Sequence, residues 1–286
     1  MTSLWNQQPV GIVGLGLIGG SLGLDLRARG VQVHGLVHRA ETAERALQRG
    51  LADRVDTDPA VLGSCGLIVL ALPLDRLLNP DAALLAALPA EAVITDVGSV
   101  KQPVLERWSG LHRRFVASHP IAGTAQAGVE AGLEGLFRGR PWVATPTTST
   151  DGAALLAVQQ LAEAVGADWL RCDAAAHDQA VALISHMPVL VSAALLQAAE
   201  QGGLEADAAA LVRRLASSGF ADTSRIGGGN PELGTLMARC NRPAVLQALH
   251  TYRRQLDALE ALVQQEQWPP LQAALSHCQA LRPEFL

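Results

Sequence analysis

The chain has 286 residues, of which 22 are basic and 27 acidic, so its formal net charge is −5. This balance argues against a nucleic-acid-binding protein, which needs a basic surface to displace phosphate counterions. Hydrophobic residues make up 49% of the chain and charged residues 17%, which is enough apolar material for one large core or two ordinary ones.

The cysteines and the apolar runs indicate the compartment. The four cysteines form no CxxC pair, which disfavours a zinc site or a disulfide framework and is typical of a reducing compartment (Cys65, Cys172, Cys240 and Cys278). No basic segment precedes the first apolar run, and no stretch approaches 18 uncharged apolar residues. The sequence therefore predicts a soluble cytoplasmic protein with no metal site and no membrane or nucleic-acid partner.

In the first part of the chain, short apolar runs alternate with helical patterns. Near-continuous apolar strands between helices predict a mostly parallel sheet that is covered on both faces. The predicted helices include residues 17–29 and 41–48. The predicted strands are residues 10–14, 31–37, 67–72, 92–95, 115–118 and 142–145.

From Asp173 onward, long patterns rich in Ala, Leu and Gln predict helices and no strand. Asp173 is expected to be an N-cap, Gly202-Gly203 a helix stop, and Pro231 and Pro243 first-turn prolines. The predicted helices are residues 174–201, 206–216, 231–238 and 243–266.

The change in pattern predicts two domains, an α/β domain over residues 1–172 and an all-helical domain over residues 173–286. Alanine-rich helices pack their backbones closely. Such a helical domain commonly completes its apolar surface with a twin subunit, so we expect a homodimer.

A glycine-rich motif, GLGLIG from Gly14 to Gly19, follows the first predicted strand and opens the first predicted helix. In this context the first glycine permits a tight turn, the second lets a pyrophosphate approach the backbone, and the third allows close helix–strand packing. A glycine turn of purely structural use is the alternative. A second strand about twenty residues further on favours a dinucleotide site, with the cofactor-binding residues Gly14, Gly16, Leu17, Ile18 and Gly19.

The end of the second predicted strand indicates which dinucleotide binds. NAD enzymes usually place Asp or Glu there for the ribose hydroxyls, but this chain has Val37, His38 and Arg39. Arg39, with His38 and Thr42, is suited to a 2′-phosphate because a guanidinium pairs well with phosphate oxygens. The alternative is that Arg39 is a solvated loop charge. The sequence favours NADP over NAD as the cofactor.

Four polar segments fall at predicted strand ends or within the helical part. Each has a structural alternative: Asp96 and Ser99 as turn residues, His119 and His186 as packed histidines, and Arg225 as a helix-end charge. Together, beside a nicotinamide site, they supply a base, a hydroxyl to orient it and an arginine for a carboxylate. The segments are residues 95–101, 118–124, 185–188 and 217–231.

Five runs of the sequence resemble the prephenate/arogenate dehydrogenase family of tyrosine biosynthesis. The resemblance extends from about residue 10 to residue 266. It implies a Rossmann domain followed by an all-helical dimerisation domain, and oxidative decarboxylation of a cyclohexadienol. The runs are GLGLIGGSL, DVGSVK, SHPIAGT, DQAVALISHMPVLVSAAL and SSGFADTSRIGGGNPELG.

The resemblance also implies the roles of four residues. The family's catalytic histidine falls on His119, and its partner serine, which orients His119 or the substrate hydroxyl, falls on Ser99. Imidazole suits proton abstraction because its unperturbed pKa lies near 6.5. The second active-site histidine, which helps to bind the ring, falls on His186, and the arginine that grips the ring carboxylate falls on Arg225.

The choice between the two substrates depends on whether the pocket accepts an ammonium group, for which Asp222 or Glu232 is a candidate counter-charge. Many prephenate-type members carry a tryptophan shortly after the arginine segment, but residues 227–234 contain none. This departure, with the NADP-type loop, resembles the arogenate-using branch. We therefore expect NADP-dependent conversion of L-arogenate to L-tyrosine. The alternatives are a prephenate dehydrogenase giving 4-hydroxyphenylpyruvate with NAD(P) and a non-enzymatic NADP-binding sensor or scaffold.

Lys101 is the only lysine in the chain and Tyr252 the only tyrosine. Short-chain dehydrogenases need a tyrosine and a lysine on one helix face, and these two residues are too far apart in the sequence for that motif. Phosphogluconate-type dehydrogenases rely on a lysine in the helical domain, and none follows Lys101. A pyrroline-carboxylate-type reductase would leave both His119 and His186 unexplained.

Overall fold

The computed structural model describes residues 4–124, 126–201 and 206–285. Six strands form a sheet in the order β3-β2-β1-β4-β5-β6, and every neighbouring pair is parallel. This order confirms the predicted Rossmann-type sheet, whose ligand crevice lies at the carboxyl edge where the strand order reverses, between β1 and β4. The strands are β1 (Val10–Val13), β2 (Val33–Leu36), β3 (Arg54–Asp56), β4 (Leu67–Leu70), β5 (Val93–Asp96) and β6 (Phe115–Val116).

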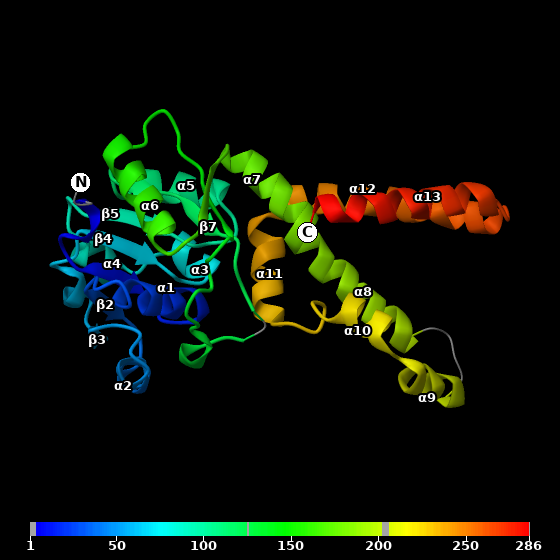
Figure 1. Ribbon diagram of the computed structural model, residues 1–286, viewed down its shortest axis with the longest axis horizontal. Coiled ribbons are helices and arrows are strands. Elements are labelled where there is room, and N and C mark those ends of the chain that lie inside the picture. Colours follow the sequence, from blue (N-terminus) through cyan, green and yellow to red (C-terminus); the bar gives the residue numbers. More distant parts are fainter. Residues whose placement is uncertain (1–3, 125, 202–205, 286) are drawn as a thin grey trace.

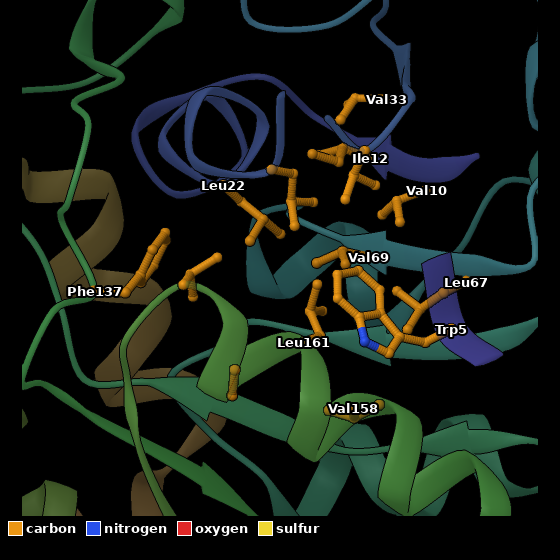
Figure 2. Close-up of a cluster of buried hydrophobic side chains, with 14 of the residues drawn as sticks. Trp5, Val10, Ile12, Leu22, Val33, Leu67, Val69, Phe137, Val158 and Leu161 are labelled. Carbon is orange, nitrogen blue, oxygen red and sulfur yellow. The ribbon is translucent and has the colours of Figure 1, made fainter. Parts of the chain in front are cut away.

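Both faces of this sheet are buried, because successive residues of a strand point to opposite sides. Along β4, Leu67 and Val69 belong to one hydrophobic cluster, whereas Ile68 and Leu70 belong to the other. Figure 2 shows part of the first cluster. It packs against α1 (Leu17–Arg27) and α6 (Gly152–Ala164), and the second cluster packs against α3 (Leu74–Leu78), α4 (Ala82–Ala87) and α5 (Gln102–Ser109).

A smaller sheet of three strands, in the order β7-β8-β9, extends this α/β region. The predicted strand over residues 115–118 is in fact divided, since β6 pairs in the large sheet and β7 (Ser118–Pro120) pairs antiparallel with β8 (Pro141–Ala144) in the small one. The sequence did not predict β3 or β9 (Asp168–Arg171). Both are edge strands without a buried residue, so their patterns carry no apolar signal.

The described residues beyond Arg171 are mostly helical, as predicted. Asp173 is the N-cap of the first helix and accepts hydrogen bonds from the N–H groups of Ala175 and Ala176. Gly202-Gly203 lies outside the described residues. Helices α10 and α13 were not among those predicted. The segments are α7 (Ala174–Val181), a π-helical turn (Ala182–His186), α8 (Met187–Gln201), α9 (Ala206–Leu215), α10 (Ser218–Ser224), α11 (Pro231–Cys240), α12 (Arg242–Gln264) and α13 (Trp268–Leu281).

The helical region contacts the α/β region through α7, which packs on α5, and α11, which packs on α3. Beyond this junction, α12 and α13 project together in one direction, and α8, α9 and α10 project in another (Figure 1). The continuous helix over Ala174–Gln201 is long and apolar enough to span a membrane by length and composition. This finding corrects the expectation that no stretch of the sequence approaches 18 uncharged apolar residues. Among the described residues, one small hydrophobic cluster lies within the helical region, with Ala182, Val245 and Ala248 as its buried members.

Candidate functional site

The glycine motif has the geometry that a dinucleotide requires. Gly14 has a φ of +94°, and a Cβ there would lie 2.3 Å from the carbonyl oxygen of Ala71. A Cβ on Gly19 would lie 1.9 Å from the carbonyl oxygen of Gly14, so α1 packs closely against the turn. A Cβ on Gly16, by contrast, would meet no described atom within 4 Å. This open space adjoins the start of α1, where no side chain caps the first N–H groups, so the loop fits a pyrophosphate.

The loop after β2 carries positive charge and no carboxylate. His38 and Arg39 are exposed, and the Arg39 Nε atom donates a hydrogen bond to His38 Nε2 over 2.8 Å. No ion pair involves Arg39 within the described chain. Thr42 lies half-buried in the first turn of α2 (Ala40–Gln48). The guanidinium is therefore free to bind a phosphate.

At the carboxyl end of β5, a fully buried ion pair joins Asp96 to Lys101. The Lys101 ammonium also donates to the carbonyl oxygen of Ser118 over 2.7 Å. The Asp96 carboxylate accepts hydrogen bonds from the N–H groups of Gly98 (2.8 Å) and Ser118 (3.1 Å). Burial lowers the pKa of Lys101 and raises that of Asp96, and their mutual attraction opposes both shifts. These bonds fix the loop after β5 against the residue that precedes His119.

His119 belongs to β7 and is half-buried. Its Nδ1 atom lies 3.0 Å from Nε2 of His177, which comes from α7 in the helical region. His177 Nδ1 in turn lies 2.8 Å from Oδ1 of Asp178. No hydrogen bond joins Ser99 to His119 in the part of the chain that is described; Ser99 lies half-buried in the loop after β5.

His186 is 2% exposed and lies at the end of the π-helical turn. The side-chain amide nitrogen of Asn241 donates to the carbonyl oxygen of Asp178 over 2.7 Å and lies 3.2 Å from His186 Nδ1. Because that nitrogen is a donor, His186 Nδ1 accepts, and the proton of a neutral ring sits on Nε2. The Nε2 atom is buried and has no partner among the described residues. The Nε2–H group of His186 is therefore available to donate a hydrogen bond to a bound molecule.

Both histidines are kept neutral by their surroundings. Burial, and then the positive charge of Lys101, hold the pKa of His119 well below the usual 6.5. Burial lowers the pKa of His186 to about 4, against the attraction of Asp178. A neutral imidazole accepts a proton, so this site is electrostatically suited to a general base.

The structure does not bring every predicted residue to one place. Arg225 follows α10, is exposed, and forms no ion pair in the described chain. Helix α10 lies beside α8 and apart from β7 in the single chain (Figure 1). The turn after Arg225 is fastened to α8, since the Gly227 N–H donates to Ser192 Oγ over 2.8 Å.

The residue pattern alone missed His177, Asp178 and Asn241. The adjacent His-Asp pair in an alanine-rich helix start was a usable signal. Its contact with His119, however, spans 58 residues of sequence and has no local signature.

Two protein-family models match this chain. The one for the nucleotide-binding domain of prephenate dehydrogenase matches residues 22–170, and the one for the dimerization domain of prephenate dehydrogenase matches residues 173–277. The prephenate dehydrogenase of Bacillus subtilis is 30% identical over 89% of this chain and 70% of its own length. The cyclohexadienyl dehydrogenase of Zymomonas mobilis is 29% identical over 89% of this chain and 88% of its own length.

Solved structures agree with these matches. Arogenate dehydrogenase from Synechocystis superposes with a TM-score of 0.81 at 43% identity, covering 97% of this chain and 100% of that one. Prephenate dehydrogenase from Aquifex aeolicus, in complex with hydroxyphenyl propionate and NAD+, has a TM-score of 0.89 at 29% identity, covering 98% and 99%. The chain therefore belongs to the prephenate/arogenate/cyclohexadienyl dehydrogenase family, oxidoreductases of aromatic amino acid biosynthesis with a Rossmann-type domain and a helical dimerisation domain.

Proposed function

We propose that this protein catalyses the NADP-dependent oxidative decarboxylation of L-arogenate to L-tyrosine, as a cytoplasmic homodimer. The observation that carries the chemistry is His119, a half-buried imidazole in β7, beside His177 of the helical region, whose pKa is lowered well below 6.5. The 43% identity to the Synechocystis arogenate dehydrogenase supports arogenate as the substrate. The expected domain boundary, between residues 172 and 173, remains part of the proposal.

In this proposal a cofactor held by Gly14, Gly16 and Gly19 would supply the hydride acceptor for oxidation of the ring carbon that bears the hydroxyl. His119 accepts the hydroxyl proton, because a carbonyl cannot form until that proton leaves. The ring carboxylate then leaves as CO2, its bonding electrons restore aromaticity, and the proton returns to the phenolate oxygen. Since aromatisation drives the last step, no covalent intermediate with the protein is required.

The remaining site residues position the substrate. Ser99 hydrogen-bonds the substrate hydroxyl or Nε2 of His119, since Nδ1 of His119 already has His177 as its partner. His186 donates to the substrate from its unpaired Nε2 atom. Arg225 pairs with the ring carboxylate in a charge-assisted hydrogen bond. Because α10 lies apart from β7 in the single chain (Figure 1), this last pairing requires either a movement of the helical region or the α10 of a second copy.

The cofactor is proposed to bind with its pyrophosphate over Gly14, Gly16 and Gly19, near the N–H groups of Leu17 and Ile18. Its 2′-phosphate then meets Arg39, with His38 and Thr42 beside it. The exposed guanidinium and the absence of a carboxylate between Leu36 and Ala40 support NADP.

Prephenate is the second candidate substrate, with NAD or NADP. The Aquifex aeolicus prephenate dehydrogenase in complex with NAD+ and the Bacillus subtilis prephenate dehydrogenase favour it. The difference between the substrates is one ammonium group. Asp222 and Glu232, both exposed in the single chain, are the candidate counter-charges near Arg225.

The test follows absorbance of the reduced nicotinamide with arogenate and prephenate, each paired with NADP and with NAD. We expect the highest kcat/KM with arogenate and NADP. Higher kcat/KM with prephenate overturns the substrate assignment, and equal kcat/KM with both cofactors overturns the cofactor assignment. Cofactor binding without turnover in any of the four assays favours the non-enzymatic sensor or scaffold.

A further inference from the structure

A line of hydrogen bonds runs from His119 into the helical region. The Nδ1 atom of His119 lies 3.0 Å from Nε2 of His177, whose Nδ1 atom lies 2.8 Å from Oδ1 of Asp178. The two imidazole rings meet edge to face, with centroids 5.2 Å apart. His177 and Asp178 are each 4% exposed. The line therefore crosses from β7 to α7 through the protein interior.

Asp178 is held in place by the α/β region. Its two oxygens accept hydrogen bonds from the backbone N–H groups of Lys101 (2.7 Å) and Gln102 (2.9 Å), at the start of α5. A backbone N–H can only donate, so both oxygens of the Asp178 side chain act as acceptors. The hydrogen bond between Asp178 and His177 must consequently be donated by His177 Nδ1.

Because His177 Nδ1 donates to Asp178, it is determined which nitrogen carries the proton in each of the two imidazole rings. A neutral imidazole carries one proton, so His177 with its proton on Nδ1 presents a lone pair at Nε2. The hydrogen bond from His119 to His177 must then be donated by His119 Nδ1. His119 is left with its lone pair on Nε2, the atom that has no hydrogen bond within the described chain.

We propose that His177 and Asp178 are positioning residues that hold His119 in the tautomer whose Nε2 atom accepts the substrate proton. This rests on the proposed function, in which His119 is the general base. When His119 takes up the proton, its Nδ1–H keeps donating to His177, and the charge of Asp178 faces the new imidazolium along the same line. Within the described chain, His177 is the only hydrogen-bond partner of the His119 ring, and the Lys101 ammonium is directed to Asp96 and Ser118.

The first test needs no substrate. In protein labelled with 15N-histidine, the His119 signals are assigned by their loss in His119→Asn. We expect a protonated Nδ1 and an unprotonated Nε2 in the unaltered protein at neutral pH. His177→Leu removes the acceptor and should give a mixture of tautomers, whereas His177→Gln keeps an acceptor oxygen near the Nε2 position and should preserve the original tautomer. A proton on Nε2 of His119 in the unaltered protein overturns the proposal.

The second test measures turnover. His177→Leu should lower kcat by about 10-fold to 100-fold with little change in KM, less than the roughly 10²–10⁴-fold loss of a missing base, and His177→Gln should recover part of it. The control is His112→Leu, which removes a half-buried histidine whose Nε2 atom lies 3.1 Å from the Pro89 carbonyl oxygen, and it should leave kcat unchanged. Unchanged kcat in His177→Leu, or no recovery in His177→Gln, contradicts the positioning role.

The two proposals fail in different ways. If the unaltered protein turns over neither arogenate nor prephenate, the proposed function is wrong, while the 15N signals of His119 still decide the tautomer. If turnover is present but His119 has the same tautomer in His177→Leu as in the unaltered protein, the positioning role is wrong and the proposed function stands.

Discussion

In the proposed reaction, the capacity of His119 to act as a base depends on its neighbours as much as on its residue type. A histidine in water is half-protonated near pH 6.5 and is then a poor proton acceptor. Here burial disfavours the charged ring, and the Lys101 ammonium adds repulsion. Lys101 is itself fixed by Asp96 and the Ser118 carbonyl oxygen, so it acts on His119 through space.

The pH dependence of the reaction tests this account. The base must be neutral, and its lowered pKa keeps it neutral as the pH falls, so the acidic limb of kcat/KM should lie below pH 6.5. His119→Asn should lower kcat by about 10²–10⁴-fold and remove that limb. Pre-steady-state and steady-state absorbance measurements between pH 5 and pH 9 provide the check. A limb at or above pH 6.5 contradicts the assignment, as does near-normal turnover in His119→Asn with its circular dichroism unchanged.

Among the secondary-structure elements, two units form different parts of the candidate cofactor site: the β1–α1 unit offers the place for a pyrophosphate, and the β2–α2 unit offers the place for the ribose. The start of α1 offers uncapped N–H groups beside Gly16, which suit any pyrophosphate and do not distinguish NADP from NAD. The β2–α2 loop is where the two cofactors differ, because the 2′ position of the ribose lies there in this fold. The loop presents Arg39, exposed and without a carboxylate partner in the described chain.

Arg39→Ala should therefore weaken NADP binding and leave NAD binding nearly unchanged. Loss of a charged hydrogen bond costs about 1.5–3 kcal/mol, which corresponds to roughly a 10-fold to 100-fold increase in the Kd of NADP. Arg29→Ala is the control, since Arg29 follows the far end of α1 and bonds to the Asp25 carbonyl oxygen. Fluorescence titration with both reduced cofactors measures the change. An equal loss for NADP and NAD shows that Arg39 does not recognise the 2′-phosphate.

At the scale of the whole molecule, the helical region has more apolar surface than one chain covers. Helix α13 has no buried residue, and α12 exposes Leu256, Leu259 and Val263 at the spacing of one helix face. The long helix over Ala174–Gln201 also exposes Leu183 and Ile184. Apolar area of this extent is typical of an interface, and one of the matching family models is described as a dimerization domain.

We expect a particle of twice the 30.0 kDa chain mass in sedimentation at micromolar concentration. Leu256→Glu should shift it to the single-chain mass, because a charge on a buried apolar interface is costly. Leu47→Glu is the matched control, a leucine of α2 that is 44% exposed against 50% for Leu256. A single-chain mass for the unaltered protein rejects the homodimer, and an unchanged dimer in Leu256→Glu places the interface elsewhere.

Local patterns were sufficient for most of the fold. Strands β1 and β4 are continuous apolar runs, β2 and β5 overlap predicted strands, and Asp173 and Pro231 mark helix starts as expected. The missed elements lack such signals. Strands β3 and β9 pair at sheet edges without burying a residue, and α13 begins at Trp268 followed by two prolines and exposes its apolar side chains.

The sequence by itself determined the nucleotide-binding unit, because Gly14, Gly16 and Gly19 lie within one strand–turn–helix segment whose pattern is local in the sequence. Through family resemblance it also predicted His119 and His186 as site residues. Only the tertiary structure decided what those histidines contact. His119 meets His177 from α7, and His186 meets Asn241 at the start of α12, across 58 and 55 residues of chain. A hydrogen bond needs two atoms within about 3 Å of each other. For His119 and His177 that condition is met only when the helical region packs against the α/β region, and for His186 and Asn241 only when the helices of the helical region pack on one another.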